Sequence, residues 1–155
     1  MRTPDAPNII AHPPVIFANG VGWGFVLDRL IAPLPITQAP QVMVLGWALL
    51  ALAGVLAVLS LERFHRFKTD VRPWKPTTAI IANGVYRLSR NPIYLGMALA
   101  HAGCGLLLDS WWILIFLALV LPVIHFGVIK REEAYLEAKF GDAYRDYKKT
   151  VRRWL

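Results

Sequence analysis

The sequence predicts an all-α, polytopic membrane protein, with four transmembrane helices and a C-terminal amphipathic helical tail in a single domain over residues 1–155. The chain is 56% hydrophobic and 17% charged, whereas soluble domains average about 45–50% and about 25%. Three stretches carry no Asp, Glu, Lys or Arg, namely Pro40–Leu61, Asn91–Leu108 and Ser110–Ile129. Each approaches the roughly 17–25 residues that span a bilayer as a helix. Alternating strands, as in a membrane barrel, are absent from the sequence.

The first two spanning segments are expected at about Pro13–Ile31 and at Gln41–Leu61. The first is the less apolar of the two, because Asn19 lies inside it and Asp28 and Arg29 lie near its end. A proline-rich loop separates the two segments, since proline interrupts helices. The second segment has no charged residue, which makes it the clearest transmembrane helix of the chain.

The third and fourth segments are expected at Pro92–Leu108 and Trp111–Ile129. Only Asp109 and Ser110 separate them, so the sequence predicts a tight antiparallel helical hairpin. The fourth segment is expected to continue as a helix beyond the membrane, into the charged residues that follow it.

The basic residues predict how the chain is oriented in the membrane. Seven Lys and Arg residues lie in Glu62–Pro92 and eight follow Ile129. With Arg2, four spans place sixteen of the seventeen on one side and leave only Arg29 on the other. The positive-inside rule then puts both termini in the cytoplasm, which we assign to a prokaryotic inner membrane. The net charge of +7 fits lipid headgroups as partners, and we expect no nucleic-acid partner.

Two other patterns are excluded as functional sites. Gly20–Gly24 spells GxGxG, but a dinucleotide fingerprint needs a preceding strand, and here the glycines lie in an apolar helix where close packing explains them. The four histidines and Cys104 show no spacing of metal ligands, so no metal site is expected. A single cysteine also forms no internal disulfide.

The loop before the third segment ends in a helix-start signal. Asn91 suits the N-cap and Pro92 the first helical position. Unpaired N–H groups at such a helix start favour a carboxylate or phosphate ligand. The alternative is a simple helix cap, with the neighbouring arginines bound to lipid headgroups.

The C-terminal tail combines a pair of acids with an amphipathic stripe. In a regular helix Glu132 shares one face with His125 and Ile129, and buried acids near a membrane are costly unless they are bound or solvated. Gly141 is expected to end the first tail helix, and Asp142 to cap the second. The stripe predicts a helix that lies on the membrane surface, and the alternative reading of the tail is an anchor without catalysis. The stripe residues are Leu136, Phe140, Tyr144, Tyr147 and Val151.

Two separate motifs lie on either side of the predicted apolar hairpin. The first is G-V-Y-R-L-S-R-N-P-I-Y-L-G at residues 84–96. The second is E-E-A-Y-L at 132–136, followed by F-G-D-A-Y at 140–144 and by Tyr147. Both motifs, in this order, resemble those of the isoprenylcysteine carboxyl methyltransferases and their phospholipid methyltransferase relatives, and the resemblance covers about Thr69–Leu155.

The resemblance implies methyl transfer from S-adenosylmethionine, with the cofactor site formed mainly by residues 69–155. Glu132 matches the family acid that contacts the cofactor. The catalytic residues are left open, with Arg90, Arg131 and Glu133 as candidates. The positions that correspond to the cofactor site are Thr78, Ala79, Ile80, Ile81, Tyr86, Asn91, Pro92, Ile93, Tyr94 and Glu132.

Two positions depart from the family pattern. Asn91 replaces the usual histidine before proline, and Val128 stands where the isoprenylcysteine enzymes carry a substrate-binding arginine, although Lys130 and Arg131 are close in sequence. The resemblance therefore supports cofactor binding more directly than it supports a prenylcysteine substrate.

We therefore expect an integral membrane methyltransferase that acts on a small or lipidic thiol, carboxylate or amine. A sulfonium donor carries an activated methyl group, so the protein has mainly to align the reactants and exclude water. A phospholipid ethanolamine N-methyltransferase and a non-catalytic membrane scaffold are the alternatives. The acceptor, the oligomeric state and the roles of His101 and His125 stay open.

Overall fold

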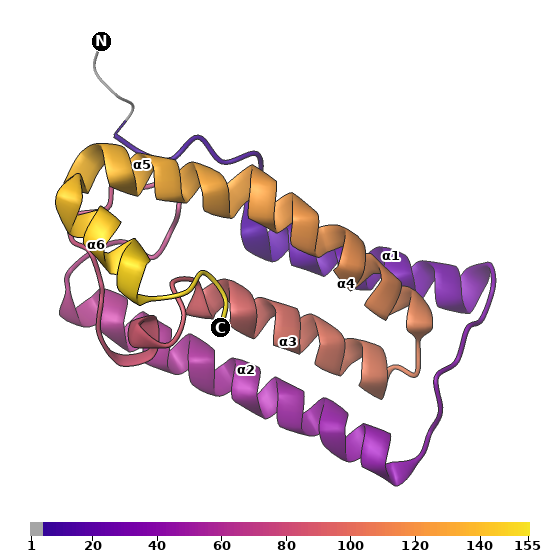
Figure 1. Cartoon of the computed structure of the whole chain (residues 1–155). Coiled ribbons are helices and arrows are strands. Elements are labelled where there is room, and N and C mark those ends of the chain that lie inside the picture. Colours follow the sequence, from indigo (N-terminus) through magenta and orange to yellow (C-terminus); the bar gives the residue numbers. More distant parts are fainter. Residues whose placement is uncertain (1–4) are drawn as a thin grey trace.

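The computed structural model describes residues 5–155, and in this range it is all-helical, without strands. Four long helices pack side by side, and a continuous extension of the last one leads into the tail (Figure 1). The helices of the bundle are α1 (Pro13–Leu30), α2 (Pro40–Arg66), α3 (Pro92–Leu107) and α4 (Trp111–Ile124). The shorter elements are a 3-10 turn (Gly84–Arg87), a π-helical turn (His125–Ile129), α5 (Lys130–Phe140) and α6 (Asp142–Thr150).

Within residues 5–155, two helices are long and apolar enough to cross a membrane. They are α2 and the continuous helix Trp111–Phe140, whose apolar part ends at Ile129. Helix α3 is also apolar but has only 16 residues, about 24 Å at 1.5 Å per residue. The predicted all-α class is confirmed, and two of the four predicted spans meet the length and hydropathy of a transmembrane helix.

Glycines bring the helices into close contact. The sequence predicted close packing for the glycines of Gly20–Gly24, and the structure confirms it for Gly20 and Gly24. A Cβ atom on Gly24 would lie 2.7 Å from the Ile113 Cα atom, so only glycine lets α1 approach α4 this closely. Gly20 packs against His101, whereas Gly22 faces open space. Between α2 and α3, a Cβ atom on Gly103 would lie 2.9 Å from the Gly46 carbonyl oxygen. Such small residues are typical of helix contacts in membranes.

The predicted hairpin between α3 and α4 is present at one end of the bundle. Asp109 occupies its turn with a φ of 54°. Its carboxylate accepts hydrogen bonds of 2.8 Å from the backbone N–H groups of Ile36 and Thr37. The turn therefore also holds the loop that connects α1 to α2.

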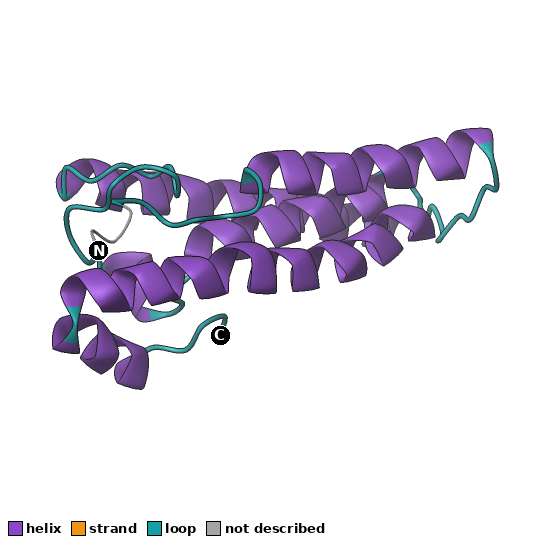
Figure 2. Cartoon of the chain, turned by 90° about the horizontal axis from the view of Figure 1, so that it is seen from above, coloured by secondary structure: helices purple, strands orange, loops and turns teal. Residues whose placement is uncertain are grey.

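The opposite end of the bundle carries the polar elements. There α5 and α6, the long loop between α2 and α3 and the C-terminal segment come together (Figures 1 and 2). The prediction that the tail stripe lies on the membrane surface is wrong. Tyr144, Tyr147 and Val151 form a buried cluster that packs against Ile80, and the Tyr147 hydroxyl donates a 2.7 Å hydrogen bond to the Tyr86 carbonyl. The long loop supplies apolar surface that the stripe covers.

The predicted break in the tail is confirmed at Gly141, which has a φ of +57°. Its cap residue differs from the prediction, because Gly141 itself occupies the N-cap of α6 and Asp142 is the first helical residue. The Asp142 carboxylate pairs with Arg145 instead of capping the helix. The turn lets α6 fold back beneath α5.

Candidate functional site

A cavity of about 370 Å³ lies at the polar end of the bundle. Its walls come from six parts of the chain: the N-terminal segment with the start of α1, the last turns of α2, the long loop between α2 and α3, the start of α3, the start of α5, and α6. The α2 wall is apolar and includes Ala57, Leu61 and Phe64. Glu132 and Glu133 are the carboxylates that α5 contributes. The cavity thus has an apolar side toward the bundle and a polar side toward the tail.

Most of the residues that the sequence singled out surround this cavity. Thr78 and Pro92 lie outside the lining that the structure describes: the Thr78 N–H donates to the Thr69 hydroxyl at 3.0 Å, and Pro92 is fully buried. A binding role for the others stays a prediction. The eight of the ten expected cofactor residues that line the cavity are Ala79, Ile80, Ile81, Tyr86, Asn91, Ile93, Tyr94 and Glu132.

The three catalytic candidates are placed differently. Arg90 and Glu133 line the cavity. Arg131 is exposed and donates a 2.8 Å hydrogen bond to the Asn8 carbonyl, on the side of α5 that faces the N-terminal segment. The structure therefore brings Arg90 and Glu133 together and separates Arg131 from them.

Glu132 faces the cavity with a single side-chain partner among the described residues. Its Oε1 atom accepts a 2.8 Å hydrogen bond from the Tyr94 hydroxyl. Burial raises the pKa of Glu132 to about 7, while the bond from Tyr94 acts in the opposite direction and the charge of Glu133 adds to the rise. Near neutral pH the group therefore exists in both forms, and its ionised form has no cation beside it.

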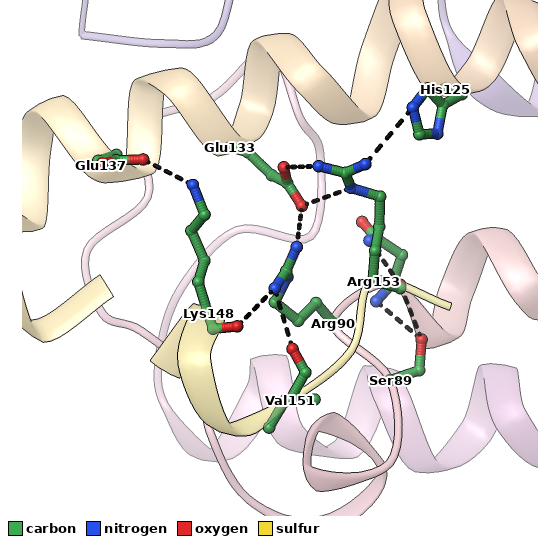
Figure 3. A network of polar contacts seen from close by, with 9 residues as sticks. Ser89, Arg90, His125, Glu133, Glu137, Lys148, Val151 and Arg153 are labelled. Atoms are coloured by element: carbon green, nitrogen blue, oxygen red, sulfur yellow. Dashed lines mark hydrogen bonds and ion pairs between the residues drawn. The ribbon is translucent and has the colours of Figure 1, made fainter. Parts of the chain in front are cut away.

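Glu133, the next residue, is enclosed by two arginines. Arg90 donates to it at 2.8 Å, and Arg153 donates twice, at 3.0 and 2.7 Å (Figure 3). Burial acts to raise its pKa, but the bonds from Arg153 and Arg90 hold the pKa of Glu133 below its ordinary value. An ionised carboxylate with both oxygens engaged is a poor proton acceptor, so Glu133 is better suited to structure than to catalysis.

Arg90, like Glu133, is engaged in contacts that hold the fold together. Besides Glu133, its guanidinium donates to the carbonyl oxygens of Lys148 and Val151, at 3.0 and 2.9 Å. These carbonyls lie in the last turn of α6 and in the residue that follows it. Only its Nε atom, which is buried, has no hydrogen-bond partner in the described part of the chain.

Asn91 occupies the N-cap of α3, as expected, but its side chain does not cap the helix. It donates a 2.9 Å hydrogen bond to the Arg153 carbonyl instead. The first N–H groups of α3 are therefore left without a side-chain cap. Such a helix start attracts negatively charged or carbonyl groups.

The π-helical turn at His125–Ile129 was missed by the sequence reading and changes which residues share a face. A π turn adds one residue to the helical repeat, so the expected alignment of His125 with Glu132 is wrong. His125 lies on the side of Glu133: its Nε2 atom is 3.4 Å from Arg153, which also holds Glu133 (Figure 3). The shift leaves Glu132 free to face the cavity.

The N-terminal segment was also missed as part of the site. Pro7, Pro13 and Pro14 line the cavity, although the sequence placed the site mainly in residues 69–155. The His12 ring stacks on the Trp74 ring, with 3.9 Å between ring centroids. Nothing in the spacing of these residues predicts that contact.

Known proteins resemble parts of this chain. The sequence model of a family described as phospholipid methyltransferase matches residues 42–143. A Haemophilus influenzae protein named only as uncharacterized is 46% identical over 63 residues, which cover 41% of this chain and 79% of that protein. The protein-S-isoprenylcysteine O-methyltransferase of Schizosaccharomyces pombe is 35% identical over 72 residues, which cover 46% of this chain and 30% of that enzyme. The match thus spans less than a third of the S. pombe enzyme.

Proposed function

The chain belongs to the phospholipid methyltransferase family, and from this premise we propose that it transfers the methyl group of S-adenosylmethionine to a lipidic or small acceptor at a membrane. The observation that carries the proposal is the position of Glu132, an acid that faces the cavity and has no cationic partner among residues 5–155. The cofactor has a cationic sulfonium and ammonium group, and both suit such an acid.

The lining residues fit the cofactor in three respects. Glu132 can accept hydrogen bonds from the amino or hydroxyl groups of the cofactor, and the Tyr94 hydroxyl orients the Glu132 carboxylate. The uncapped start of α3 suits the carboxylate of the cofactor. Ile80 and Ile81 provide apolar surface. The bound cofactor supplies an activated methyl group, and the protein contributes alignment and exclusion of water.

The charges around the cavity favour an amine or a thiol over a carboxylate as the acceptor. Both arginines of the lining are already bound to acids, Arg72 to Asp70 and Arg90 to Glu133. Val128 is fully buried in the apolar core, not in the cavity wall. A carboxylate acceptor would therefore lack a charge-assisted hydrogen bond worth about 1.5–3 kcal/mol.

We expect farnesylcysteine analogues to be poor acceptors for this reason. Their rate of methylation by the purified protein should be low at concentrations where an accepted amine or thiol reacts. Efficient turnover of such an analogue at micromolar concentration would contradict this acceptor class.

A phospholipid ethanolamine N-methyltransferase is the second candidate, favoured by the family match and by the unpaired acid at Glu132, which suits a cationic headgroup. The apolar α2 wall, with Ala57 and Leu61, suits an acyl chain that approaches from the bilayer. Incubation with methyl-labelled S-adenosylmethionine and a membrane extract tests both candidates. Label in methylated ethanolamine lipids supports the second, label in a thiol supports a thiol acceptor, and absence of any cofactor binding indicates a scaffold.

The topology that accompanies this function has four spans, with both termini and the loop between α2 and α3 in the cytoplasm of a prokaryote. The basic residues near the cavity support it through the positive-inside rule; Arg2 lies outside the described residues. Reporter fusions at Leu155 and at Asp109 should report opposite sides of the membrane. Reports from the same side would rule out the four-span arrangement.

A further inference from the structure

The C-terminal segment after α6 contacts the residues before α3 and the start of α5, although none of residues 152–155 is among the residues that line the cavity. The Arg90 N–H donates to the Arg152 carbonyl at 3.0 Å. The Ser89 hydroxyl and the Asn91 amide both donate to the Arg153 carbonyl, at 3.2 and 2.9 Å. These bonds hold the residues that immediately precede α3.

Arg153 also reaches the other wall through its side chain. Its guanidinium binds both oxygens of Glu133 on α5, and its Nη1 atom lies 3.4 Å from His125 (Figure 3). A planar guanidinium that binds a carboxylate through two bonds fixes orientation as well as distance. One residue thus joins the start of α3, by its carbonyl, to the start of α5, by its side chain.

On the basis of the proposed cofactor site, we propose that Arg153 is a positioning residue, which sets the distance and orientation between Glu132 and the start of α3 without touching the ligand. Glu132 is adjacent to the carboxylate that Arg153 holds, and Tyr94 is one turn from the Asn91 side chain that its carbonyl holds. The next residue, Trp154, packs against the apolar core that contains Tyr94, so the segment is anchored on both sides of Arg153.

The same bridge explains why the two acids differ. Arg153 and Arg90 bind Glu133, which keeps that carboxylate ionised and fixes its position. The neighbouring Glu132 side chain faces the cavity. Loss of the Arg153 guanidinium leaves Glu133 with Arg90 alone and releases α5 from the C-terminal segment. The cofactor pocket is then expected to lose its geometry even though its lining is unchanged.

The test is the affinity for S-adenosylhomocysteine, measured by calorimetry on the full-length protein, together with thermal unfolding. We expect Arg153→Gln to weaken binding by about ten- to a hundredfold, the effect of a lost charge-assisted pair. Arg153→Lys keeps the charge but not the two-pronged geometry, so it should restore part of the affinity. The control is Arg145→Gln, which removes an exposed arginine of α6 that pairs only with Asp142, and it should bind as the wild type does.

A double-mutant cycle with Glu133→Gln separates positioning from general destabilisation. If Arg153 acts through Glu133, the second substitution adds little once the first is made. Additive losses, or wild-type affinity in Arg153→Gln, would overturn the inference and leave the proposed function standing. If Arg153→Gln does not fold, wild-type affinity in folded Arg153→Lys overturns it equally. Failure of the wild-type protein to bind S-adenosylhomocysteine overturns both the inference and the proposed function.

Discussion

The two adjacent acids of α5, Glu132 and Glu133, have very different surroundings. Glu133 is bound by Arg90 and Arg153 and connects α5 to the loop and to the C-terminal segment. Glu132 is bound by one tyrosine and faces the cavity. Their pKa values are displaced in opposite directions, downward for Glu133 and upward for Glu132. Perturbed pKa values cluster at functional sites, and the opposite displacements support the proposal that Glu132 contacts a ligand while Glu133 supports the fold.

The largest loss of stability is expected when Glu133, the acid that binds the two arginines, is removed. Glu133→Ala leaves the Arg90 guanidinium, whose side chain is 8% exposed, without its carboxylate. Removing one partner of a buried pair costs about 3–5 kcal/mol, so the Tm should fall by many degrees. Glu133→Gln keeps some of the hydrogen bonds and should fall less. An unchanged Tm in Glu133→Ala would show that the arginines do not depend on this acid.

The corresponding change at Glu132 is expected to act in the opposite direction on stability. Its pKa is about 7 in the fold against an ordinary value of 4.5. Between these values the unfolded chain loses the proton first, so the free energy of unfolding falls as the pH rises from about 4.5 to about 7 and stays low above that.

Glu132→Gln removes this pH-dependent fall in the free energy of unfolding. The variant should therefore be more stable than the wild type at pH 8, by on the order of 3 kcal/mol, with little change at pH 4. Unfolding at the two pH values measures the difference. A lower Tm for Glu132→Gln at pH 8 would mean that the acid stabilises the fold and is not held there for a ligand.

A smaller effect, on ligand affinity, is expected from removing the Tyr94 hydroxyl that donates to Glu132. Tyr94→Phe removes the 2.8 Å hydrogen bond to the carboxylate, a bond worth about 1.5 kcal/mol or somewhat more to a charged group. We expect about tenfold weaker binding of S-adenosylhomocysteine. Trp112→Phe, which removes a 2.7 Å hydrogen bond from the Trp112 indole to the Ala32 carbonyl at the opposite end of the bundle, is the control and should bind normally. If Tyr94→Phe and the control variant bind S-adenosylhomocysteine with equal affinity, the Tyr94 hydroxyl has no part in ligand binding.

The smallest effect is expected at the partly exposed ion pair farther along α5. Lys148 binds Glu137 at 2.8 Å, and the two side chains are 32% and 35% exposed. Such pairs contribute about 0–1 kcal/mol, so Lys148→Gln should change the Tm by a few degrees at most. A loss as large as that of Glu133→Ala would show that the exposed pair contributes as much to stability as the buried pair.

The helices were predictable because the membrane imposes a simple rule on composition. Uncharged stretches located α2, α3 and α4, and glycine positions indicated the close helix contacts. Gly141 marked the break in the tail. These features depend on local composition and spacing, which a sequence states directly.

The site was only partly predictable, since its remaining parts depend on tertiary contacts. The motifs identified Glu132 and Tyr94, but no spacing connects Glu133 to Arg153, twenty residues later. The π-helical turn at His125–Ile129 leaves no distinctive pattern in an apolar helix. The tail stripe has the same amphipathic pattern whether it covers a membrane or, as here, the loop around Ile80.

Titration with S-adenosylhomocysteine at pH 8, where Glu132 is mostly ionised, tests the central claim most directly. The wild-type protein should bind, and Glu132→Gln should bind about ten- to a hundredfold more weakly, because it loses a charge-assisted hydrogen bond of about 1.5–3 kcal/mol. Glu137→Gln, which changes an acid whose side chain pairs with Lys148, should match the wild type. Equal affinity of wild type and folded Glu132→Gln would contradict the assignment of Glu132 to the cofactor site.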